Sequence, residues 1–159
     1  MYQLLRLDQQ GLTLIELFLV MAILSALALT AIPFYGNIKD NARNARCAGE
    51  VRAIEKVIYT FSIDNGGNFP SGLDQLNLAS LKDPWGRNYL YYNIITHGTG
   101  GARKDGVADL NTDFDLYSQG ADGQSDLDDI TADISQDDIV RAGDGGFVGI
   151  GNIYMPPSR

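Results

Sequence analysis

A long apolar run follows a short polar stretch at the start of the chain. Residues 12–35 read LTLIELFLVMAILSALALTAIPFY, in which Glu16 is the one charged side chain. As an α-helix this run would rise roughly 36 Å, more than the about 30 Å thickness of a bilayer's hydrocarbon core. The pattern therefore predicts a membrane-spanning helix that carries a single carboxylate near its beginning.

Beyond the apolar run, apolar residues recur at three- to four-residue steps while basic residues occupy the other faces. Pro33 lacks a backbone donor, so together with Gly36 it should kink or locally melt the helix. A breaker cluster, DNGGN at residues 64–68, should end it. We expect one long helix whose second half, residues 36–62, packs an apolar face on a head. The recurring apolar positions are Ile38, Ala42, Ala45, Val51, Ile54, Ile58 and Phe61.

The remaining residues, 63–159, carry shorter patterns. Phe69–Leu76 reads as a short capped helix, and the aromatic and β-branched run Asn88–Ile95 reads as a strand. Thr112–Tyr117 alternates apolar and acidic residues like a second strand, and Phe147–Tyr154 could form a third. The fold class is α+β: a long N-terminal helix, transmembrane in its first half, packed on a small antiparallel β-sheet head.

Composition limits the kinds of partner and of covalent link that this chain can have. The chain has 159 residues and a net charge of -8, which allows one modest acidic domain beyond the helix and argues against binding nucleic acid. With one cysteine, Cys47, no intramolecular disulfide can form. Its helical surroundings favour a small packing residue over a redox or intermolecular role.

Three features that could suggest an enzyme do not support one. The glycine-rich residues 98–104 lack the G-K-[ST] ending and the strand-to-helix context of a phosphate loop. His97 has no neighbouring Cys or second His for a transition metal, and Ser118 has no paired base. We expect no enzyme.

The polar residues 1–11 look like a removable leader. A secretory peptidase could cut at the small residues Ala26, Ala28 and Ala31, but the apolar run is long for such a signal. Cleavage after Gly11 would instead place a new amine on Leu12, four residues from Glu16. An ordinary signal anchor with a stray glutamate is the simpler alternative.

The motif G-L-T-L-I-E-L at residues 11–17, followed by Val20, Ala22, Ile23, Ala26 and Pro33, resembles the leader and N-terminal helix of type IV pilins and type II secretion pseudopilins. The resemblance implies that a membrane prepilin peptidase cuts after Gly11 and methylates the amine of Leu12. It also implies that Glu16 pairs with this amine on a neighbouring subunit, which sets register during assembly. In related filaments the helix loosens near Pro33 as it leaves the membrane, which implies a role for Pro33 in assembly. The chain departs from the family in Leu12, usually Phe, and in the uncharged residues before Gly11.

The head resembles one branch of this superfamily. D-P-W-G at residues 83–86, D-L-Y-S-Q-G-A-D-G at 115–123 and D-D-I at 128–130 are similar to the G-type major pseudopilin of type II secretion. The similarity leaves out residues 96–110 and the tail after Ile139. Trp85 is expected to anchor the core beside a turn.

An acidic stretch carries the candidate metal site. Between Asp105 and Asp144 lie twelve of the chain's 20 acidic residues and one basic residue. Carboxylates on glycine-containing loops suit Ca²⁺, yet the EF-hand pattern fails, so the residues alone leave a calcium site and a solvated acidic loop both open. The resemblance implies calcium, held by carboxylates of Asp122 and Asp129 and carbonyls of Gln119, Gln124 and Leu127, with Asp126 and Asp128 as substitutes.

The expected function is that of a structural subunit of a secretion pseudopilus. The resemblance implies a single-pass protein of the bacterial inner membrane whose head lies in the periplasm. It would polymerise with its own copies and minor pseudopilins on an ATP-driven inner-membrane assembly platform, and so export folded proteins across the outer membrane. The alternatives are a surface type IV pilin for adhesion, motility or DNA uptake, which often has two C-terminal cysteines that this chain lacks, and a monomeric calcium-binding domain on an anchor, which would not need Glu16.

Overall fold

The computed structural model describes residues 11–154, and of residues 31–34 the backbone alone. Two compact units divide the chain after Asp40. Helix α1 (Leu14–Asp64) runs through both of them. The backbone remains helical at Pro33 and Gly36, which argues against local melting there. The predicted kink and the role of Pro33 in assembly stay predictions, and most of the predicted leader, residues 1–10, lies outside the described residues.

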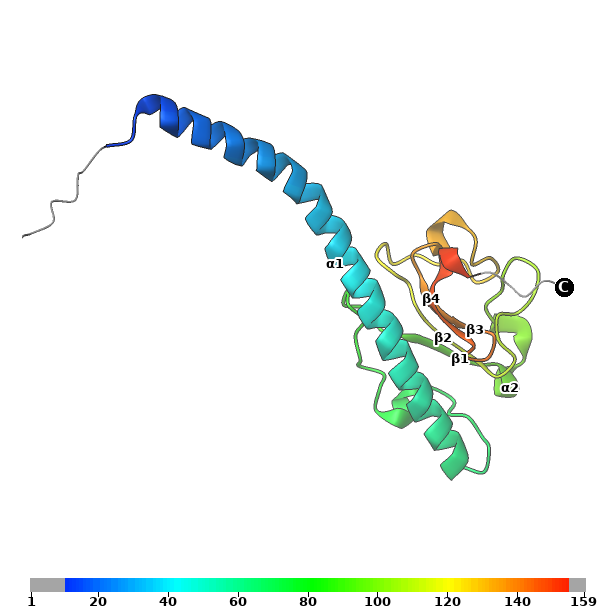
Figure 1. The fold of residues 1–159 in the computed structure, drawn as a ribbon. Coiled ribbons are helices and arrows are strands. Elements are labelled where there is room, and N and C mark those ends of the chain that lie inside the picture. The colour runs from blue at the N-terminus through cyan, green and yellow to red at the C-terminus, as the bar shows by residue number, and fades with distance from the viewer. Residues whose placement is uncertain (1–10, 155–159) are drawn as a thin grey trace, which may run out of the picture. The chain divides into compact units, whose positions relative to one another are not determined.

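The second unit is an α+β head, as the sequence predicts. Its strands β1 (Leu90–Asn93), β2 (Phe114–Ser118), β3 (Ile139–Ala142) and β4 (Phe147–Ile150) form one sheet in the order β1-β2-β3-β4. Every neighbouring pair is antiparallel. Figure 1 shows the second half of α1 along one face of this sheet.

The apolar stripe of α1 forms the larger core with the sheet. Val51 and Ile58 are completely buried, and Ile54 is 3% exposed, because their spacing keeps them on one helical face. They pack on Phe114, Leu116 and Ile139. The predicted stripe begins later than expected, since Ile38 is 65% exposed. The helix ends at Asp64, where the glycines that follow adopt the positive φ of a turn.

Cys47 and Trp85 take the packing roles that the sequence predicts. Cys47, a residue of α1, is fully buried in the core between α1 and the sheet, and Trp85 packs against the same core. Burial raises the pKa of the Cys47 thiol to about 11, so the thiol is protonated and unreactive at neutral pH. A small packing residue is therefore the right interpretation of Cys47.

The strand predicted at residues 88–95 is shorter in the structure, where β1 spans Leu90–Asn93, so the prediction runs two residues too far at each end. Asn93 ends β1 because its side chain accepts a hydrogen bond from Thr96 N at 3.0 Å and caps the short helix α2 (Ile94–His97). The predicted capped helix at 69–76 is only a 3₁₀ turn, Leu73–Leu76, and Gly72 before it provides no side-chain cap. Strand β2 confirms the second predicted strand, and β4 the first half of the third. Strand β3 has no counterpart among the predicted elements.

Candidate functional site

The start of α1 shows what Glu16 does within one copy of the chain. Its Oε2 accepts hydrogen bonds from Thr13 N at 3.0 Å and from Thr13 Oγ1 at 2.9 Å. Glu16 N donates in return to Thr13 Oγ1 at 3.3 Å. This is a capping box, which satisfies helix-end donors that otherwise lack partners. The carboxylate is thereby held at the positive end of the helix dipole.

The side chains of the apolar run that the structure describes, residues 12–30 and Tyr35, are exposed. A window of mean hydropathy 2.4 in α1 is 0% buried, and Leu14, Ile15 and Phe18 are each more than 70% exposed. Such a surface needs lipid or other helices around it. By length and composition the helix is able to cross a membrane.

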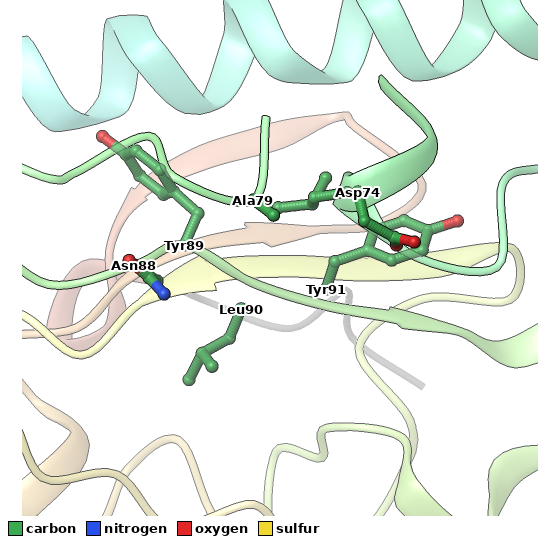
Figure 2. Close-up of a pocket in the computed structure, with 7 residues that line it drawn as sticks. Asp74, Ala79, Asn88, Tyr89, Leu90 and Tyr91 are labelled. Atoms are coloured by element: carbon green, nitrogen blue, oxygen red, sulfur yellow. The ribbon is translucent and has the colours of Figure 1, made fainter. Parts of the chain in front are cut away.

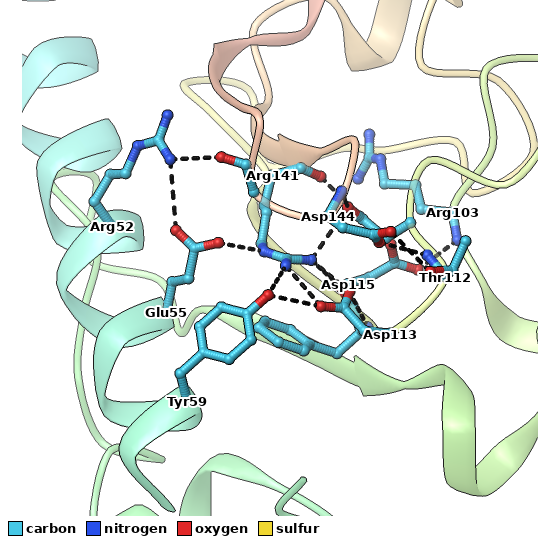
Figure 3. Close-up of polar contacts among 12 residues, drawn as sticks. Arg52, Glu55, Tyr59, Arg103, Thr112, Asp113, Asp115, Arg141 and Asp144 are labelled. Atoms are coloured by element: carbon cyan, nitrogen blue, oxygen red, sulfur yellow. Dashed lines mark hydrogen bonds and ion pairs between the residues drawn. The ribbon is translucent and has the colours of Figure 1, made fainter. Parts of the chain in front are cut away.

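In the head, Arg141 joins α1 to the sheet (Figure 3). Its side chain is completely buried, and its Nε donates to Glu55 Oε1 at 2.7 Å. Its two terminal nitrogens bind both carboxylate oxygens of Asp113, at 2.7 and 2.8 Å. The guanidinium also lies over the ring of Phe114, 4.0 Å from its centroid. The bidentate geometry suits arginine and would not suit lysine.

A second buried arginine anchors the acidic loop on the other face of the sheet. Arg103 is 1% exposed and pairs with Asp138, which is fully buried. Arg103 Nη1 also donates to Ser125 Oγ at 2.7 Å, and its guanidinium lies over Tyr117. Burial raises the pKa of Asp138 to about 6, even though Arg103 and Ser125 favour its ionised form.

The D-P-W-G motif is a turn that holds a third arginine against the same loop. Asp83 Oδ1 accepts from Trp85 N at 3.0 Å and from Arg87 N at 2.9 Å, and Gly86 between them has a φ of 90°. Arg87 then donates to the carbonyl of Gly120. Arg103 and Arg87 therefore place positive charges of the protein itself against the acidic loop.

The predicted calcium ligands lie in that loop, where most of them make local hydrogen bonds. Asp122 Oδ1 accepts from Gln124 N at 2.7 Å, and Asp129 Oδ1 accepts from Thr131 N at 2.8 Å. The hydrogen bonds from Thr131 hold the pKa of Asp129 below its usual value.

The other predicted ligands are similarly engaged. The carbonyls of Gln119 and Leu127 accept from Gly123 N and Lys104 N. Asp126 Oδ1 accepts from Asp128 N, and Asp128 pairs with Lys104. Within residues 11–154 no three His, Cys, Asp or Glu side chains are gathered to hold a metal. Their carboxylate and carbonyl oxygens are of the type that Ca²⁺ prefers, but among the described residues the carboxylates do not converge on one point.

A cavity of about 300 Å³ lies beside β1 (Figure 2). Asp74 and Asn88 supply polar groups, and aromatic and aliphatic side chains the rest. None of the seven lining residues is a Ser, Cys or His. Ser118 lies elsewhere, buried, and donates to Asp83 Oδ2 at 2.6 Å. The lining residues are Leu73, Asp74, Ala79, Asn88, Tyr89, Leu90 and Tyr91.

Sequence reasoning missed the arginine anchors and the cap. The spacing Thr13-x-x-Glu16 is a readable signal for a capping box. Arg141 gives no such signal, because its partner Glu55 lies 86 residues away in the sequence.

Comparison with known proteins gives consistent matches. Residues 35–137 match the family model described as type II secretion system (T2SS), protein G. Type II secretion system core protein G of Pseudomonas aeruginosa is 33% identical, in a match that covers 81% of this chain and 95% of that protein. The core protein G of Klebsiella pneumoniae is 30% identical, covering 75% and 81%, and that of Escherichia coli is 27% identical, covering 77% and 90%. No solved structure gives a significant match.

Proposed function

Because this chain belongs to the type II secretion system protein G family, the core pseudopilins, we propose that it polymerises through α1 into a periplasmic filament that drives export of folded proteins. The observation that carries this proposal is similarity over nearly the full length of named core subunits. It favours a secretion pseudopilus over a surface type IV pilus. A structural subunit, not an enzyme, is the role that this family membership supports.

The proposal includes the steps before assembly. A prepilin peptidase cuts after Gly11 and methylates the amine of Leu12. The processed chain stays anchored in the bacterial inner membrane by residues 12–35, with its head in the periplasm, which fits the exposed apolar helix. Its partners are further copies of itself, minor pseudopilins and the inner-membrane assembly platform.

The proposal is tested by removing the gene for this chain from its native host. Export of proteins across the outer membrane should stop, and it should return when the gene is restored. Overproduction of the chain together with its assembly platform should yield filaments that sediment and contain this chain. Normal export in the deletion strain, or absence of filaments in the presence of the platform, would contradict the proposal.

We also propose that Ca²⁺ closes the acidic loop, held by Asp122 and Asp129 and by backbone carbonyls of Gln119, Gln124 and Leu127. Two features support it: hard oxygen donors dominate the loop, and the chain has no disulfide to hold the head. Asp126 and Asp128 are alternative ligands. Binding of the ion by the folded state alone would stabilise the head outside the cytoplasm.

Calcium should therefore raise the melting temperature of the full chain in detergent. At a hundredfold excess over Kd the rise should be roughly 5–10 °C relative to a chelator. Asp122→Ala with Asp129→Ala should abolish the response. Asp133→Ala, which removes an exposed carboxylate of the same stretch outside the ligand set, should keep it. Equal melting temperatures of the parent with calcium and with chelator would reject the site.

A further inference from the structure

The two faces of the sheet present different surfaces to solvent. The second half of α1 covers one face, with Val51, Ile54 and Ile58 packed on Phe114 and Ile139. The loops before β2 and β3 cover the other face, where Leu110 and Ile130 pack on Tyr117, Val140 and Ala142. Figure 1 accordingly shows the segment after α2 on the side of the sheet away from α1. The head thus has a helix side and a loop side.

The helix side carries an apolar groove of about 140 Å³. Ala53, Ile54 and Val57 of α1 form one wall, and Leu78 and Leu81 form the other, with Glu50 at the end. Val57 is 43% exposed and Leu81 is 36% exposed, although both are large and apolar. A groove of this size has room for one or two aliphatic side chains.

The loop side carries an apolar tip. Val107 lies at the tip of the loop formed by residues 104–109, and it is 77% exposed. Asp105 Oδ1 accepts from Val107 N at 3.0 Å and from Ala108 N at 2.7 Å, and Asp105 N donates to Ala108 O at 2.9 Å. The buried Arg103 holds the base of this loop. Val107 is therefore presented by a loop whose backbone is already fixed, so little entropy is lost when it binds.

The charges of the two sides are complementary. Around the groove, α1 exposes Lys56 and Arg46; Arg46 is 65% exposed and pairs with Glu50, so one positive charge remains in excess on this side. Around Val107, Asp128 is 79% exposed but pairs with Lys104, and the surface is acidic because Asp105, Asp109 and Asp129 lie on the same loops. Opposite charges favour contact between a helix side and a loop side, and they disfavour contact between two like sides.

We propose that Val107 of one copy of this chain docks in the groove of a second copy, between Val57 and Leu81. The inference rests on the proposed polymerisation, and it adds the surfaces that meet. Because the groove and the tip lie on different sides of one head, each copy can offer a tip to one neighbour and a groove to another. Such a heterologous contact, when it does not close into a ring, generates an open helical filament.

Cysteine cross-linking tests the contact. The one native cysteine, Cys47, is fully buried and should not compete. Filaments of the full chain with Val57→Cys and Val107→Cys should give a ladder of covalent multimers on oxidation, since each copy can be linked on both sides. The matched control is Val57→Cys with Ile95→Cys, because Ile95 is also an exposed apolar residue, 66% exposed, but lies in α2. The control should give at least about tenfold less product.

The single variants complete the test. Val57→Cys or Val107→Cys alone should stay monomeric on a denaturing gel, and dimers from either one would show a symmetric contact and overturn the inference. Filaments that form without a ladder would overturn it as well and leave the proposed function standing. Failure of the parent chain to form filaments with its platform would overturn the proposed function and this inference together.

Without cysteines, Val107→Asp should lower the filament yield at least about tenfold, because a carboxylate would be buried in an apolar groove. Val107→Leu adds one methylene and keeps the side chain apolar, so its yield should stay near that of the parent. Equal yields from Val107→Asp and the parent would contradict the contact.

Discussion

Glu16→Gln should leave the chain inserted in the membrane and stop filament assembly. Glutamine retains the size of glutamate and can still serve in the capping box with Thr13, so the start of α1 should remain intact. What it loses is the charge that would pair with the Leu12 amine of a neighbour. Leaving one member of a buried ion pair alone costs about 3–5 kcal/mol, at least a hundredfold in an association constant.

The comparison with Glu16→Ala separates the cap from the charge. Alanine removes both, and loss of the cap alone costs about 1 kcal/mol. We expect both variants to fractionate with membranes and both to give few sedimenting filaments. Normal assembly of Glu16→Gln beside failure of Glu16→Ala would mean that assembly needs the cap and not the charge.

The capping box also explains how a single copy can carry this carboxylate before assembly. A charged side chain within a helix end costs roughly 2–3 kcal/mol on insertion, less at the headgroups. Hydrogen bonds from Thr13 N and Oγ1 offset part of that cost within one chain. Pairing with a neighbouring amine must therefore compete with the cap, and it wins only if the amine is brought close in an apolar surrounding.

The elements that the sequence predicts well are those with a strong local period. The apolar run and the stripe of Val51, Ile54 and Ile58 identify α1, and the alternation around Phe114 identifies β2. The end of β1 was misplaced because Asn93 starts a helix through its own side chain, which outweighs the β-branched residues after it. The short strand β3 is harder still, since its four residues, IVRA, show no apolar–polar alternation and include the charged Arg141, which is buried.

The buried charged residues could not be predicted from the sequence, for a different reason. Asp138 and Arg141 lie in the acidic stretch, whose composition suggests a solvated loop, and Arg103 lies in the glycine-rich residues 98–104, yet all three are buried. Their partners come from distant parts of the chain, as Arg141 with Glu55 shows. Composition records that charges are present, but only the fold decides which of them meet. The same limit applies to the calcium ligands, which the family resemblance implied and the residues alone did not.

Arg141→Met should destabilise the head more than any other single change considered. It would leave the buried Glu55 and the two oxygens of Asp113 without their shared cation, at a cost of about 3–5 kcal/mol in the free energy of unfolding. Denaturant unfolding of the chain in detergent, followed by tyrosine and tryptophan fluorescence, measures this loss. A fall of this size is a large part of the stability of a small domain.

Arg52→Met is the matched control, because Arg52 also forms an ion pair with Glu55, at 3.6 Å. Its Nη1 also donates a hydrogen bond to the backbone carbonyl of Gly145. Its side chain is 45% exposed, and exposed ion pairs contribute at most about 1 kcal/mol. Arg141→Lys should fall between the two, since lysine keeps the charge but cannot bind both oxygens of Asp113 while reaching Glu55. Equal losses for Arg52→Met and Arg141→Met would show that burial of the guanidinium adds nothing, and that the apolar stripe of α1 alone holds the helix on the sheet.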